Sequence, residues 1–172
     1  MGRFLRDGGP CCGRVVKGDL MATVTDGART PASIWIVGIL ATLWNGFGAY
    51  DYLMTRLRNE DWIRSMMPGA DPAAVFAWAD AFPLYAQIAW PLGVWGGLAG
   101  SILLLLRSRF AVHAFAVSLI GAVVGMAYQL FAAAPMPGPE SAVTKIMPFV
   151  IIAIAIFLLW FASTMRKKGV LR

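Results

Sequence analysis

The chain has 172 residues, of which 59% are hydrophobic and only 14% are charged. A soluble domain of this length rarely has so apolar a composition, so the sequence predicts an integral membrane protein whose surroundings are the lipid bilayer. The net charge of +6 is also typical of nucleic-acid-binding proteins, but the basic residues gather in short clusters beside apolar runs, which indicates membrane topology and no nucleic-acid partner.

Residues 1–30 are rich in Gly, Arg, Asp and Thr and show no helical periodicity, so they are predicted to form a disordered cytoplasmic tail. Cys11 and Cys12 are adjacent in this tail and lack the spacing of metal ligands. No apolar signal region precedes them, so they do not predict a lipoprotein anchor. Met21 is a second possible start, and residues 1–20 would then be dispensable.

The first apolar run, residues 32–53, follows Pro31 and is long enough to cross a hydrocarbon core, which needs about 20 residues. Residues 54–81 are too polar to span and are expected to form a periplasmic loop. Within this loop, Asp71 is a candidate N-cap, with Pro72 at the first helical position. We therefore expect a short helix at the membrane interface between the first two spans.

Three further spans are predicted at residues 82–106, 110–134 and 146–165. The tight turn at 107–109 is short enough to place the second and third spans side by side. The predicted fold class is therefore an all-α bundle of four transmembrane helices covering residues 31–165, with a short periplasmic interfacial helix between the first and second spans.

The stretch from Trp90 to Arg109 contains glycines four residues apart, where a neighbouring helix backbone can approach closely. Pro91 removes a backbone hydrogen bond inside this span and is expected to bend it. The run from Leu103 to Leu106 is expected to face lipid. The predicted helix-packing residues, two of them in the third span, are Gly93, Gly96, Gly97, Gly100, Gly121 and Gly125.

Lysine and arginine are divided unevenly between the two sides of the four spans. The N-terminal tail, the 107–109 turn and the 166–172 tail carry 11 of these 15 residues, and the 54–81 and 135–145 loops carry the other 4. Because cytoplasmic segments are enriched in Lys and Arg, both termini are predicted to be cytoplasmic. Residues 166–172 are accordingly interpreted as a basic cytoplasmic tail.

Polar residues in the spans are the first place to look for a functional site, because such groups are costly in a membrane. In one interpretation, Asn45 and Asp51 form the wall of an outward-facing pocket for a solute or an ion. In the alternative that we favour, Asn45 makes an interhelical hydrogen bond, and Asp51 marks the membrane boundary or pairs with Arg56 or Arg58. The candidate polar pocket consists of Asn45, Asp51, Tyr52, Tyr85, Gln87, Tyr128 and Gln129.

His113 is the only histidine of the chain, so neither a bis-histidine haem nor a zinc site with three or four protein ligands can be built within one chain. It is expected to be an interfacial side chain. The sequence contains no Gly-x-Ser-x-Gly, phosphate-loop, Cys-x-x-Cys or His-Glu-x-x-His pattern. We therefore predict a protein that is not an enzyme and has no catalytic residue, metal or cofactor.

A set of recognisable stretches comprises WNGFGAYDYLMT at residues 44–55, Phe82-Pro83, Ala89-Trp90, residues 93–101, residues 103–109 and the 169–172 tail. Together they resemble a family of small four-helix bacterial inner-membrane proteins, whose members are mostly uncharacterised and in part labelled sugar transporter. The resemblance covers residues 31–172. It implies a multi-pass protein of the bacterial inner membrane and provides no catalytic residues.

Two functions remain open at this point. One is a small-solute, sugar-like permease that acts as an oligomer, because four helices enclose little volume alone and a permeation path would need a second copy or a partner. The other is a non-catalytic accessory or assembly subunit of a larger membrane complex. The expected partners are therefore a second copy of the chain or other membrane proteins.

Overall fold

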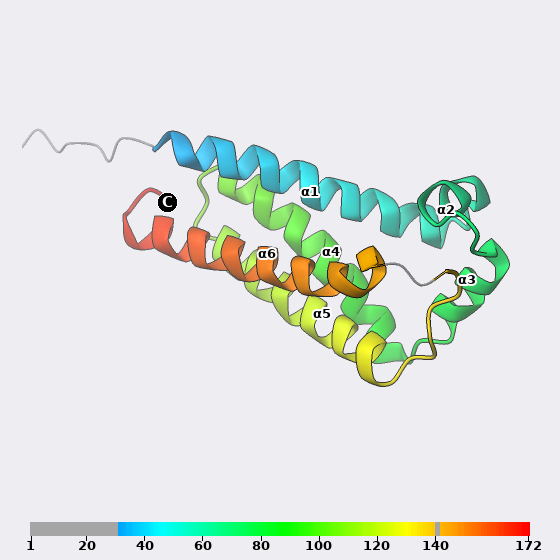
Figure 1. The fold of residues 1–172 in the computed structure, drawn as a ribbon. Helices are drawn as coiled ribbons and strands as arrows, with labels where there is room; N and C mark the ends of the chain where they lie inside the picture. Colours follow the sequence, from blue (N-terminus) through cyan, green and yellow to red (C-terminus); the bar gives the residue numbers. More distant parts are fainter. Residues whose placement is uncertain (1–30, 140–141) are drawn as a thin grey trace, which may run out of the picture.

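A computed structural model of the protein describes residues 31–139 and 142–172 (Figure 1). The tail predicted at residues 1–30, with its two cysteines, lies outside these ranges. The described chain is helical, and its helices are α1 (Ala32–Arg56), α2 (Glu60–Met66), α3 (Pro72–Asp80), α4 (Leu84–Leu105), α5 (Ala111–Phe131) and α6 (Ala142–Lys167).

Four of these helices, α1, α4, α5 and α6, are long and apolar enough to cross a membrane. The predicted four-helix fold is therefore confirmed. The helix ends differ in detail: α5 ends at Phe131, earlier than predicted, and α6 begins at Ala142 and not at residue 146. Consequently Pro148 lies inside α6, beyond its first turn, and not at the start of the helix.

The four long helices run antiparallel and pack in the order α1, α4, α5, α6 (Figure 1). The start of α1, the α4–α5 turn and the end of α6 lie at one end of the bundle, which we call the C-terminal end. The short helices α2 and α3 lie at the other end, which we call the α2–α3 end, together with residues 132–139, which follow α5.

The largest buried cluster combines residues of all four long helices with two from the C-terminal tail. Ile34 and Leu104 are fully buried, and Phe115 is only 2% exposed. The expectation that the leucine run of α4 faces lipid is thus wrong for Leu104. Successive residues of a helix point about 100° apart, so one leucine of four consecutive ones must turn toward the neighbouring helices.

The C-terminal tail folds back onto the bundle. Helix α6 ends with Gly169 in the left-handed region, at φ +69, and the Val170 N–H donates to the Met165 carbonyl at 3.1 Å. Val170 and Leu171 are 3% and 5% exposed. The tail then pairs with the α4–α5 turn, because the Arg172 N–H donates to the Arg107 carbonyl at 2.8 Å. The basic tail is therefore also part of the core.

Two short helices, and not one, connect α1 to α4. The predicted start of α3 is confirmed: Asp71 Oδ1 accepts from the Ala73 N–H at 3.2 Å, with Pro72 next to the cap. Helix α2 was not expected from the sequence. It is capped by Asn59, whose Oδ1 accepts from the Trp62 N–H at 2.9 Å. This Asn followed by two acidic residues is itself a helix-start signal.

Candidate functional site

Asn45 connects α1 to α4. Its amide nitrogen donates to the Ala41 carbonyl at 2.8 Å and to Ser101 Oγ at 3.1 Å. The buried Ser101 hydroxyl in turn donates to the Gly97 carbonyl at 2.8 Å. The geometry is that of the interhelical hydrogen bond favoured from the sequence, and it engages the Asn45 amide nitrogen and the Ser101 hydroxyl.

Asp51 is held by α2. Its Oδ1 accepts a hydrogen bond from Trp62 Nε1 at 2.8 Å, and the Trp62 ring packs edge-on against Tyr50 with a centroid distance of 4.9 Å. The predicted pairing of Asp51 with Arg58 is wrong, because Arg58 forms its ion pair with Asp80. Asp51 therefore fixes the position of α2 against the end of α1.

The three tyrosines of the candidate pocket belong to a continuous set of ring contacts. Tyr52 packs against Trp90 at 5.4 Å, and Trp90 against Phe82 at 6.2 Å. Phe82 then contacts Tyr128 at 5.0 Å, and Tyr128 contacts Tyr85 at 5.9 Å. We call these five residues the aromatic chain. It links α1, α4 and α5 at the α2–α3 end, so ring packing occupies the region where the pocket was expected.

The two glutamines lie in different surroundings. Gln87 Nε2 donates to the Phe82 carbonyl at 2.8 Å and to the Asp80 carbonyl at 3.3 Å, so it satisfies backbone groups where α3 passes into α4. Gln129 is half-buried on α5. The seven residues of the candidate pocket are thus distributed over separate contacts.

Helices α4 and α5 approach each other backbone to backbone. A Cβ atom added at Gly121 would lie 2.5 Å from the Gly93 nitrogen and 2.6 Å from the Ala89 oxygen. One at Gly96 would lie 3.1 Å from the Ser118 nitrogen. Ser118 itself, which sequence inspection did not single out as a packing residue, donates its hydroxyl to the Gly93 carbonyl at 2.5 Å.

The remaining predicted packing glycines differ in how closely they approach neighbouring helices. A Cβ at Gly97 would collide with the Asn45 side chain, and one at Gly100 would lie 2.8 Å from the Phe115 ring. Gly125 has no neighbouring atom within 4 Å of that position, so it does not make the close approach expected of it. Gly38 of α1 approaches the Leu105 side chain between α1 and α4.

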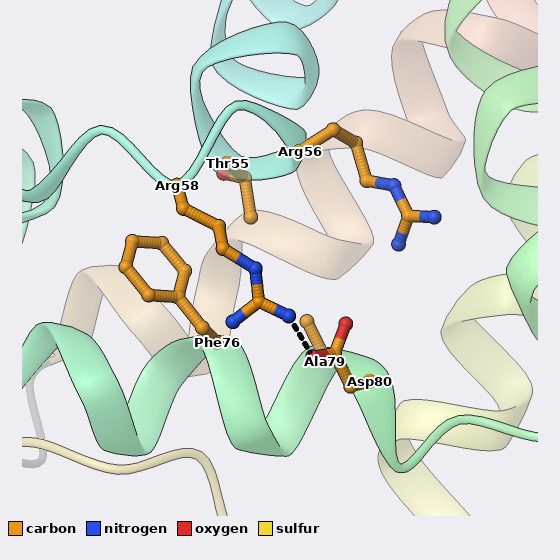
Figure 2. A pocket seen from close by; sticks show the side chains of 6 residues that line it. All are labelled: Thr55, Arg56, Arg58, Phe76, Ala79 and Asp80. Atoms are coloured by element: carbon orange, nitrogen blue, oxygen red, sulfur yellow. Dashed lines mark hydrogen bonds and ion pairs between the residues drawn. The ribbon is translucent and has the colours of Figure 1, made fainter.

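A cavity of about 190 Å³ lies at the α2–α3 end, between the end of α1 and α3 (Figure 2). Arg58 Nη2 lies 2.5 Å from Asp80 Oδ2, and the Arg58 guanidinium lies 5.8 Å from the centre of the Phe76 ring. Figure 2 shows the Arg56 side chain pointing away from this pair. The cavity is lined by Thr55, Arg56, Arg58, Phe76, Ala79 and Asp80.

Arg58 reaches this cavity from an unfavourable backbone conformation. Its φ is 55, and it follows the end of α1, where its N–H donates to the Thr55 carbonyl at 3.1 Å. Glycine is usual at this position because a side chain there costs about 1–2 kcal/mol. The ion pair with Asp80 is half exposed and returns about 0–1 kcal/mol, and the contact with Phe76 about 0.5–1 kcal/mol. These terms nearly cancel, so Arg58 brings little net stability.

Within residues 31–139 and 142–172, no three His, Cys, Asp or Glu side chains lie close enough together to hold a metal ion. His113 is exposed, with its ring 6.1 Å from that of Phe110. It lies in the first turn of α5.

Comparison of the sequence with models of protein families and with curated proteins, and of the fold with solved structures, finds no match. The class of the protein is therefore inferred from its own structure alone. The four long apolar helices define a multi-pass integral membrane protein.

Proposed function

We propose that the protein is a non-catalytic accessory or assembly subunit of a larger membrane complex. One observation carries this proposal: polar side chains of the spans are used to hold helices together. Asn45 bonds Ser101 across α1 and α4, and Ser118 bonds the Gly93 carbonyl across α5 and α4. Side chains engaged in this way stabilise a scaffold and do not line a path for a solute.

The outer faces of the helices also favour this role over a permease that acts as an oligomer. A permeation path between copies needs polar groups on the faces that meet, whereas the outward stripe of α4 is apolar. Its exposed large side chains are Leu84, Tyr85, Ile88, Leu92, Trp95, Ile102 and Leu106. Such a surface suits lipid or the apolar helices of a partner.

The proposal includes a place in the bacterial inner membrane with both termini in the cytoplasm, supported by the distribution of Lys and Arg and by the family resemblance. Cysteine labelling tests the orientation. In a background without Cys11 and Cys12, Ser65→Cys on α2 should react with an impermeant reagent in intact cells, and Lys168→Cys should react only after lysis. Both positions are exposed. Labelling of both from the same side contradicts the orientation.

Purification from native membranes tests the function itself. The affinity tag belongs at the N-terminus, because Val170 and Leu171 are buried and Arg172 is hydrogen-bonded to the α4–α5 turn. We expect another membrane protein to co-purify at a fixed ratio, also when the tag is moved to that protein, and liposomes of the purified chain to be inert. Uptake of labelled sugars by such liposomes would establish the permease instead. Inert liposomes without any co-purifying protein also contradict the subunit role.

A further inference from the structure

We propose that Arg56 and Arg58 bind a phosphate-type oxyanion in the cavity between α1 and α3. This inference does not depend on the proposed subunit role. The cavity of about 190 Å³ is smaller than the roughly 300–1,000 Å³ of pockets for drug-sized ligands. It therefore suits a single phosphate group and not a ligand of several rings.

The net positive charge of the side chains around the cavity favours the binding of an anion. Two arginines and one aspartate line it, and Arg58 already pairs with Asp80. The Arg56 side chain has no hydrogen-bond or ion-pair partner among residues 31–139 and 142–172. The Arg56 guanidinium is thus available for a ligand, and its planar set of N–H donors can form two parallel hydrogen bonds to the oxygens of a phosphate or phosphodiester.

The backbone at Arg58 supports the same assignment. Its left-handed conformation is one that glycine adopts at little cost, and its contacts with Asp80 and Phe76 do little more than offset the strain. Strained residues of this kind cluster at binding sites, where the surrounding structure holds a side chain ready for a ligand. The strained residue thus contributes a second guanidinium to the lining of the cavity that Arg56 also lines (Figure 2).

The position of the cavity identifies two sources of such an anion. Arg56 is the last residue of the apolar helix α1, and the aromatic chain lies at the same end of the bundle. Aromatic residues of membrane proteins concentrate at the level of the lipid headgroups. We therefore expect phospholipid phosphate groups at the depth of the cavity and free phosphate to reach it from the water, and both have the same chemistry.

Two binding measurements on the full chain in a maltoside detergent separate these sources. Calorimetric titration with inorganic phosphate measures the free anion. Native mass spectrometry after addition of phosphatidylglycerol measures the lipid, with diacylglycerol, which has the same acyl chains and no phosphate, as the reference. Binding of phosphate alone identifies a soluble anion, and retention of phosphatidylglycerol alone identifies a headgroup site. Binding of neither, or equal retention of diacylglycerol, overturns the proposal.

Three variants assign the binding to the cavity. Arg56→Gln removes a guanidinium that has no partner in the described chain, so it should leave Tm unchanged and weaken binding about tenfold or more. Asp80→Asn releases Arg58 and should strengthen binding. Arg64→Gln is the matched control: Arg64 is an exposed arginine of α2 that pairs with Glu60 and does not line the cavity. Equal binding by the Arg56 and Arg64 variants, or weaker binding by Asp80→Asn, refutes the site.

Discussion

The contact between α4 and α5 makes Gly121→Ala a sharp test of the packing. The added methyl group would lie 2.5 Å from the Gly93 nitrogen and 2.6 Å from the Ala89 oxygen. Both are backbone atoms and cannot rotate away, so the helices must separate locally by about 1 Å, and a gap of that size removes up to half of the dispersion energy of each affected contact.

Overpacking of this kind costs about 1–3 kcal/mol. Taking about 2 kcal/mol, and a shift of about 2–4 °C per kcal/mol for a chain of this size, Gly121→Ala should lower Tm by roughly 4–8 °C. Thermal unfolding in detergent, followed by circular dichroism, measures this change.

The matched control is Gly125→Ala, in the same helix and one turn further along. Apart from the nearby residues of α5 itself, no atom lies within 4 Å of the added methyl group at this position. Alanine also has a higher helix propensity than glycine by about 1 kcal/mol, so this variant should keep or raise Tm. The same methyl group is thus expected to act in opposite directions at Gly121 and Gly125. Equal Tm values for the two variants would refute the close approach of α4 and α5.

Three further predictions concern single contacts. In a double-mutant cycle of Asn45→Ala and Ser101→Ala, the free energies of unfolding should give a coupling energy of about 0.6 kcal/mol, and at most about 1.7 kcal/mol. A coupling energy of zero would show that the interhelical hydrogen bond does not contribute to stability. Asp51→Asn keeps an oxygen acceptor for the neighbouring indole N–H, so its free energy of unfolding should change by less than about 1 kcal/mol, and a loss above about 2 kcal/mol would contradict this. Leu171→Ala should cost about 2–5 kcal/mol in unfolding experiments, unlike the exposed Lys168→Ala, and similar values for both would show that the tail is not packed.

The sequence by itself determined the number, type and approximate ends of the spans. In a hydrocarbon core each backbone N–H and C=O must form a hydrogen bond within the protein. An apolar run of about 20 residues that crosses this core is therefore expected to be a helix. The start of α3 was also predictable from the sequence, because it depends on neighbouring residues: Asp71 caps the helix and Pro72 is its first residue. Six glycines, among them Gly93 and Gly121, were also recognisable as packing positions, and all of them except Gly125 make close approaches to a neighbouring helix.

Only the tertiary structure decided which face of each helix is inside. In a soluble protein the core side is the apolar side, but lipid is as apolar as leucine, so the sequence does not distinguish Leu104, which is buried, from Leu106, which is exposed. The hydrogen bond of Asp51 with Trp62 joins α1 to α2, and the ion pair of Arg58 with Asp80 joins the turn after α1 to α3. Such contacts depend on how α1 packs against α2 and α3 in space, and the spacing of residues along the chain does not predict that packing.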